Sequence, residues 1–244
     1  MNTQNKNVEY RCGKTQHQGY LALPKSDRKP TPGIIVIHEW WGINDYIRHR
    51  CAMLAELGYT ALGIDLYGDG YQAENPDQAT TAMNSVLSDI SLANNRLQAG
   101  YDFLVAQSNV DSSKTAAIGY CFGGAMALHM ARLGLPLSAV VSFHGILSPF
   151  RTPEHGSIQA RILICHGRED VMVSMDDVEE FRKEMKKLGA NYQVNIYPGA
   201  GHGFTSQKAD HNAQKHGIPV GYNKQADQNS WKAMKDLFSL LWDE

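Results

Sequence analysis

The chain has 244 residues, a formal net charge of -2 and 43% hydrophobic residues. This length is compatible with one α/β domain, and we expect a single domain over residues 1–244. A charge this close to neutral excludes the strongly basic surface that holds a nucleic-acid backbone, so no nucleic-acid partner is expected.

Targeting and redox signals are sparse. Residues 1–14 are polar and lack the apolar core of a secretory signal, and no apolar run approaches the about 20 residues that cross a bilayer. We therefore expect a soluble, cytoplasmic protein with no membrane partner. The four cysteines are scattered without a C-x-x-C pair and are interpreted as free thiols: Cys12 in a hairpin, Cys51 and Cys165 in the core, and Cys121 in a glycine-rich turn.

The first predicted element is a β-hairpin over residues 8–24, VEYRCGKTQHQGYLALP, followed by a polar linker over 25–33. Short apolar runs and amphipathic segments then alternate. Strands are predicted at 33–38, 59–67, 114–120, 139–145, 161–167 and 192–199, and helices at 46–58, 91–107, 125–134, 178–190 and 230–244.

This alternation predicts an α/β fold in which a mostly parallel central sheet has helices on both faces. Two segments lack a clear period, one at 68–89 and a long polar one at 205–230. The second exceeds the usual length of a connection in a compact domain, which indicates a functional or a mobile loop.

The stretch GYCFGG, residues 119–124, lies between a predicted strand and a predicted helix. It fits the nucleophile-elbow pattern G-x-S-x-G with Cys121 in place of serine, and the sharp turn requires glycines on either side. The positive end of the helix favours a thiolate, and the N–H of Phe122 faces a developing oxyanion. Alternatively, Cys121 is a small buried residue at a close-packed turn.

An elbow requires an acid and a histidine later in the chain, in that order. Asp170 follows one predicted strand and His202 follows the next, so both should reach the sheet edge that holds Cys121. His202 would act as the base and Asp170 would fix its tautomer, with Glu169 as a less favoured acid. Alternatively, Asp170 caps the following helix and His202 is an ordinary loop residue.

Glu39 and Trp40 end an earlier strand, in HEWWG, where this architecture places the second oxyanion N–H. We expect that N–H from Trp40. Glu39 is either a functional carboxylate or a solvated charge, and Trp41 is interpreted as pocket wall or core.

Other histidines are candidates for a metal site or for the lining of a pocket. His202, His211 and His216 share a polar region, but their spacing matches no recognised metal signature, so no metal is expected. His38, His144 and His166 stand at predicted strand ends, where they line a pocket or form hydrogen bonds in the core.

Taken together, HEWWG, GYCFGG, HGREDVMV and GHGF resemble the dienelactone hydrolase family of α/β-hydrolases, in order along nearly the whole chain. The resemblance implies an α/β-hydrolase fold, no cofactor, and a triad of Cys121, His202 and Asp170. It also implies that Glu39 helps to deprotonate the thiol when substrate binds, and that Phe122 and Trp40 donate to the oxyanion.

The sequence departs from family members that act on dienelactone, which bind the substrate carboxylate with arginines. The early segment GDGYQAENPDQATT has none, and Thr205 and Ser206 stand where the second arginine would fall, with Lys208 as a possible point charge.

We expect a hydrolase of activated esters, lactones or enol esters that works through a thioester acyl-enzyme, as a monomer or a homodimer. The alternatives are a thiol redox sensor and a catalytically silent binding module.

Overall fold

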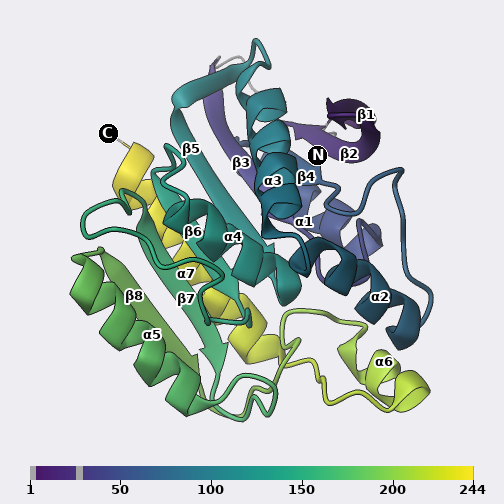
Figure 1. The fold of residues 1–244 in the computed structure, drawn as a ribbon, viewed down its shortest axis with the longest axis vertical. Coiled ribbons are helices and arrows are strands. Elements are labelled where there is room, and N and C mark those ends of the chain that lie inside the picture. Colours follow the sequence, from purple (N-terminus) through teal and green to yellow (C-terminus); the bar gives the residue numbers. More distant parts are fainter. Residues whose placement is uncertain (1–3, 26–29, 244) are drawn as a thin grey trace. The chain divides into compact units, whose positions relative to one another are not determined.

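The structure is a computed structural model that describes residues 4–25 and 30–243. Within the described residues the chain forms eight strands and seven helices, and it divides into two compact units, residues 1–118 and 119–244. Most strands are parallel, and the hairpin is the antiparallel exception. Figure 1 shows the order of the elements along the chain.

The first unit begins with the predicted hairpin, in which β1 (Gln4–Cys12) pairs antiparallel with β2 (Thr15–Leu23). Strand β2 also pairs antiparallel with β4 (Thr60–Ile64), which lies parallel to β3 (Thr31–Ile37). The strand order is β1-β2-β4-β3-β5, and β5 (Val110–Tyr120) continues into the first two residues of the second unit. Residues 26–29 of the predicted linker lie outside the described residues.

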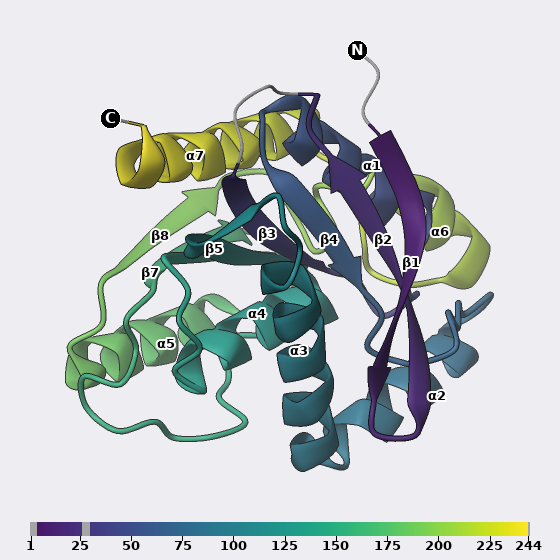
Figure 2. The same ribbon diagram turned by 90° about the horizontal axis from the view of Figure 1, so that it is seen from above.

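Helices cover both faces of the strands in the first unit. Helix α1 (Asp45–Glu56) packs against β2, β3 and β4, and α3 (Ile90–Val105) packs against β1, β3 and β4 from the other side (Figure 2). All residues of β3 from Ile34 to Ile37 are fully buried, as expected for a parallel strand covered on both faces.

In the second unit, β6 (Ala139–Phe143), β7 (Arg161–Gly167) and β8 (Tyr192–Tyr197) are parallel and lie in that order. Helices α4 (Phe122–Arg132) and α5 (Met175–Leu188) cover one face, and α7 (Lys224–Trp242) covers the other (Figure 2). The predicted α/β class, with a mostly parallel sheet, helices on both faces and an N-terminal hairpin, is therefore confirmed.

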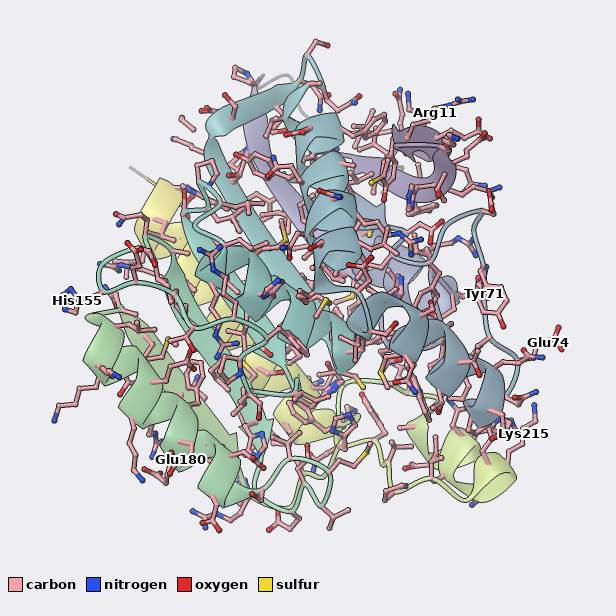
Figure 3. All side chains as sticks on the ribbon, viewed as in Figure 1. Arg11, Tyr71, Glu74, His155, Glu180 and Lys215 are labelled. Atoms are coloured by element: carbon pink, nitrogen blue, oxygen red, sulfur yellow. The ribbon has the colours of Figure 1, made fainter. Side chains whose placement is uncertain are left out.

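Helix α5 illustrates how the sequence specifies an element. Its buried side chains recur three and four residues apart, at Val178, Phe181, Met185 and Leu188. Ser174 and Asp177 form a capping box at its start, and Gly189 ends it in the left-handed conformation. Charged side chains cover its outer face, where Glu180 points to solvent, as Arg11 does on β1 of the first unit (Figure 3).

Three helical segments differ from the sequence prediction. Helix α2 (Pro76–Leu87) lies in the segment 68–89, and α6 (Ala209–His216) lies in the polar segment 205–230. Helix α7 begins at Lys224, six residues before the predicted start. Both α2 and α7 start after an asparagine whose side chain accepts a backbone N–H, a start signal that a search for apolar periodicity misses.

Candidate active site

Cys121 forms a nucleophile elbow between β5 and α4. Its backbone has φ 54° and ψ -120°, a strained conformation for a residue with a side chain. Its N–H donates to the carbonyl of Phe143 at 3.0 Å, and its side chain is half-buried. Strain of this kind persists only where the surrounding structure enforces it.

Glycines allow this turn for a steric reason. A Cβ atom at Gly119 would run into the backbone of Gly123 and lie 2.7 Å from the nitrogen of Gly124. A Cβ atom at Gly124 would lie 2.6 Å from Oγ of Ser142. Phe122 is the first residue of α4, and N–H groups in a first helical turn point out along the axis.

His202 and Asp170 meet directly, although 32 residues separate them. Nδ1 of His202 lies 2.9 Å from Oδ2 of Asp170, and both side chains are buried. Oδ1 of Asp170 accepts the backbone N–H groups of Met172 and Val173 at 2.9 and 3.0 Å. The cap of α5 is Ser174, so the alternative interpretation of Asp170 as a helix cap is wrong.

The ionisation of the pair follows from its surroundings. Burial raises the pKa of Asp170, but the hydrogen bond and charge of His202 and the two backbone N–H groups bring it below its usual value. Burial lowers the pKa of His202, yet the charge of Cys121 and the hydrogen bond with Asp170 raise it to about 10. The ring of His202 therefore favours the imidazolium form.

His202 and Cys121 interact without meeting strict hydrogen-bond geometry. No described residue meets hydrogen-bond geometry at Nε2 of His202, although the thiol lies near enough to raise the pKa of the ring. Catalytic hydrogen bonds are often long without substrate and tighten when it binds. Cys121, His202 and Asp170 are thus gathered within one unit, at the ends of β5, β8 and β7 respectively.

The polar segment after His202 braces the histidine loop. Gly221 donates its N–H to the carbonyl of His202, and Asn223 donates to that of Phe204, each at 3.0 Å. The side chain of Asn223 also donates to the carbonyl of Gly199 at 2.9 Å. This part of the segment therefore holds the loop from both sides, which the sequence pattern did not indicate.

A second imidazole supports the first. The ring of His144 packs edge-on against that of His202, with centroids 5.2 Å apart, and its Nε2 lies 2.7 Å from Oγ1 of Thr205. His144 is fully buried with φ 41°, so its backbone is strained as well. His166 is also buried, and burial lowers its pKa. His144 and Thr205 are 61 residues apart, so only the structure reveals their contact.

Glu39 and Trp40 lie in the first unit, directly after β3. Glu39 is 8% exposed, so it is a buried carboxylate and not a solvated charge. Nε2 of His38 accepts the N–H of Leu66 at 3.2 Å, and Nδ1 therefore donates to the carbonyl of Glu39 at 2.5 Å. The hydroxyl of Tyr67 donates to the carbonyl of Trp40 at 2.8 Å. The backbone on both sides of Trp40 is thus held in place.

Other candidate groups do not form sites. Among residues 4–25 and 30–243, no three histidine, cysteine or acidic side chains gather in a way that could hold a metal ion. All four cysteines are free, Cys51 and Cys165 are buried, and burial raises the pKa of Cys165 to about 12. Over the same residues, no helix is both long and apolar enough to span a membrane.

The model of the dienelactone hydrolase family matches residues 17–241. The chain belongs to the dienelactone hydrolase family. This family assignment covers both compact units and confirms the resemblance drawn from the motifs.

Solved structures agree with the family assignment. A dienelactone hydrolase-like promiscuous phosphotriesterase, P91 from metagenomic libraries, is 37% identical with a TM-score of 0.92, covering 98% of each chain. A protein named m3DLH is 36% identical, with the same TM-score and coverage. A Synechocystis relative named "Putative carboxymethylenebutenolidase" is 30% identical over 245 residues, 91% of each chain. As a dienelactone hydrolase family member, the protein is an ester or lactone hydrolase with the α/β-hydrolase fold.

Proposed function

We propose that this dienelactone hydrolase family member uses Cys121 as its nucleophile to hydrolyse activated carboxylic esters, lactones or enol esters through a thioester acyl-enzyme. The supporting observation is the strained elbow that presents Cys121 near a histidine held by a buried carboxylate. Activated substrates are favoured because a thiolate leaves the tetrahedral intermediate more readily than an alkoxide does.

In the acylation step, the thiolate of Cys121 attacks the carbonyl carbon and a C–S bond forms. The C–O bond to the leaving group then breaks, and protonated His202 gives its proton to the departing oxygen. Asp170 holds Nδ1, so that Nε2 is the nitrogen that exchanges this proton.

In the second step, neutral His202 takes a proton from water as the oxygen attacks the thioester carbon. The C–S bond breaks, Cys121 leaves as a thiolate beside the protonated ring, and the acid is released. The N–H groups of Phe122 and Trp40 stabilise the oxyanion in both steps. No metal or cofactor takes part in this proposal.

Glu39 has a separate role in the proposal, which is to help ionise the thiol. Its burial after β3 supports a functional carboxylate. Glu39→Gln should slow alkylation of Cys121 by iodoacetamide and slow acylation, while the unfolding transition stays in place. Unchanged alkylation and acylation rates would remove this role.

The nucleophile is tested with 4-nitrophenyl acetate and purified protein. Cys121→Ala should abolish turnover, whereas the wild type should give a burst of nitrophenol and an acetylated Cys121 peptide by mass spectrometry. The matched control is Cys165→Ala, which removes a buried thiol of the same unit and should keep both signals. Wild-type turnover in Cys121→Ala would reject the proposal.

A second candidate activity is phosphotriester hydrolysis. It is favoured by the likeness to P91, whose name describes a promiscuous phosphotriesterase. The test is release of nitrophenol from a dialkyl 4-nitrophenyl phosphate by wild type and Cys121→Ala; equal release by both variants would exclude a role for Cys121.

A redox role is the less favoured alternative. The other cysteine of the second unit, Cys165, is buried with a raised pKa and so is a poor resolving thiol.

A further inference from the structure

Strand β8 has a free hydrogen-bonding edge. It is the last strand in the order and pairs on one side only, with β7. The carbonyls of Asn191 and Tyr197 accept N–H groups from Ile162 and Arg168 on the β7 side. Since alternate residues of a strand face the same side, Tyr192, Val194 and Ile196 direct their N–H and C=O groups outward, and no described residue pairs with them.

The sequence of β8 does not protect this edge. Natural edge strands are usually blunted by charged residues, proline or a bulge. Strand β8 reads YQVNIY and has neither a charge nor a proline, whereas the opposite edge strand β1 has Lys6, Glu9 and Arg11. An uncharged edge of six residues is suited to pairing with another strand.

We propose that β8 is the contact surface for a second copy of this chain, joined by antiparallel pairing of the two β8 strands about a two-fold axis at Val194. In this register Val194 faces Val194 of the second copy, and Tyr192 faces its Ile196. All of these residues direct their backbone groups outward, so each of these pairs is hydrogen-bonded. A register centred on Gln193 would oppose backbone groups already used by β7.

The side chains match this register. Tyr192 opposite Ile196 and Val194 opposite itself are aromatic and β-branched pairs, which stabilise antiparallel strands. On the other face Gln193 lies opposite Asn195 of the second copy, and the two amides can bond to each other. Within one chain these side chains already form such a bond, at 2.8 Å.

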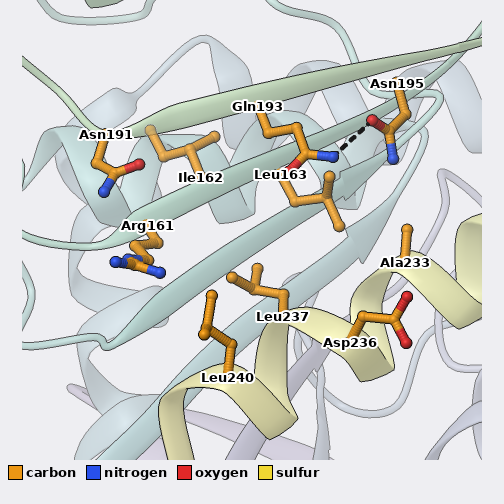
Figure 4. Close-up of a pocket in the computed structure, with 10 residues that line it drawn as sticks. All are labelled: Arg161, Ile162, Leu163, Asn191, Gln193, Asn195, Ala233, Asp236, Leu237 and Leu240. Carbon is orange, nitrogen blue, oxygen red and sulfur yellow. Dashed lines mark hydrogen bonds between the residues drawn. The ribbon is translucent and has the colours of Figure 1, made fainter.

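The groove beside β8 also carries side chains of opposite charge at its two ends. Strands β7 and β8 and helix α7 enclose a cavity of about 410 Å³ at the strand starts, away from the catalytic loops that follow the strand ends. Arg161 lies at its Asn191 end, without an ion-pair partner among the described residues, and Asp236, which forms an ion pair with Lys232 of the same helix at 2.6 Å, lies at the opposite end (Figure 4). A two-fold axis reverses the ends and brings Arg161 of each copy toward Asp236 of the other. Leu240, which is 70% exposed, lies beside this junction.

The test is the oligomeric state of the full chain, measured by sedimentation velocity from 1 to 100 µM. The wild type should be a dimer. Gln193→Lys with Asn195→Lys sets like charges opposite each other and should weaken dimerisation at least about tenfold. The matched control, Gln193→Glu with Asn195→Lys, sets opposite charges in the same places and should remain dimeric. Esterase activity per chain should be unchanged in both variants, which excludes misfolding.

Cross-linking tests the register. The two Cα atoms of residue 194 should be about 5.5 Å apart, within reach of a disulfide, so Val194→Cys should give a covalent dimer on mild oxidation. Gln193→Cys is the control, because its two copies are offset along the strands and should cross-link far less. A monomeric wild type at 100 µM, a dimer that survives both lysine substitutions, or equal cross-linking of the two cysteine variants would overturn the proposal.

Discussion

At the scale of single residues, the two roles that the sequence left open for Asp170 can be separated. Its carboxylate binds His202 through one oxygen and the N–H groups of Met172 and Val173 through the other. The helix that follows is capped by Ser174. Asp170 therefore acts on the histidine, and Ser174 acts on the helix.

We expect Asp170→Asn to lower kcat/KM for an aryl acetate by about 100-fold or more, because the neutral amide no longer stabilises the imidazolium of His202. Ser174→Ala is the matched control, because it removes the cap of α5, the helix that follows the loop of Asp170. It should lower the free energy of unfolding by about 1 kcal/mol and leave kcat unchanged. Equal losses of activity in the two variants would contradict this division of roles.

A second residue prediction concerns His38. The C=O of Glu39 and the N–H of Trp40 belong to one rigid peptide plane, so the ring that holds the carbonyl also fixes the direction of the N–H. Burial lowers the pKa of His38, which keeps the ring neutral and able to accept from Leu66.

His38→Phe should lower kcat about 10- to 100-fold with little change in KM, because the Trp40 N–H is the proposed second donor to the oxyanion of the transition state. His38→Gln can both donate and accept, and should restore most of the loss. If kcat and KM fell equally in both variants, the result would argue against a positioning role for His38. The same would be true if neither value fell.

At the scale of elements, the strands and long helices could be predicted and the polar helices could not. Strands such as β3 and helices such as α5 bury enough apolar side chains to leave a period in the sequence. Helix α6 buries only Ala209, so its helical character leaves no apolar pattern. The elbow was predictable because a strand, a helix and the glycines between them are consecutive, whereas the contact of His144 with Thr205 depends on tertiary folding.

Helix α4 carries a buried histidine that links stability to pH. Burial, together with the charges of Arg132 and Arg151, lowers the pKa of His129 to about 4, and its ring packs edge-on against Phe150. The neutral ring is favoured in the fold, while the unfolded chain protonates near the ordinary value of 6.5. The contribution of the neutral His129 ring to the free energy of unfolding is therefore fully present above pH 6.5 and is lost as the pH falls toward 4.

Between pH 7.5 and 4, the free energy of unfolding of the wild type should fall by on the order of 2 kcal/mol more than that of His129→Phe, which keeps an aromatic ring against Phe150. Guanidinium denaturation at the two pH values measures the difference. The remaining acid sensitivity is common to both proteins and cancels. Parallel losses of stability would show that His129 does not titrate in this range.

At the scale of the whole molecule, the placement of cations bears on the proposed preference for neutral substrates. The chain has a formal net charge of -2 and no arginine in the segment after the early strands. Past the histidine, Thr205 and Ser206 are buried, and Thr205 is engaged by His144. Neither position can present a cation to a substrate carboxylate, whereas Lys208, at the start of α6, is an exposed charge that follows them in the chain.

We therefore expect neutral aryl and enol esters to be hydrolysed with a kcat/KM at least about tenfold higher than matched esters that carry a carboxylate. The pair to compare is 4-nitrophenyl butyrate and its ω-carboxylate analogue, 4-nitrophenyl succinate. If Lys208 substitutes for an arginine as a point charge, Lys208→Gln should widen the gap, mainly through KM, and 0.5 M salt should have a similar effect on the wild type. Equal kcat/KM values for the two esters would show that a cation elsewhere in the molecule recognises the carboxylate.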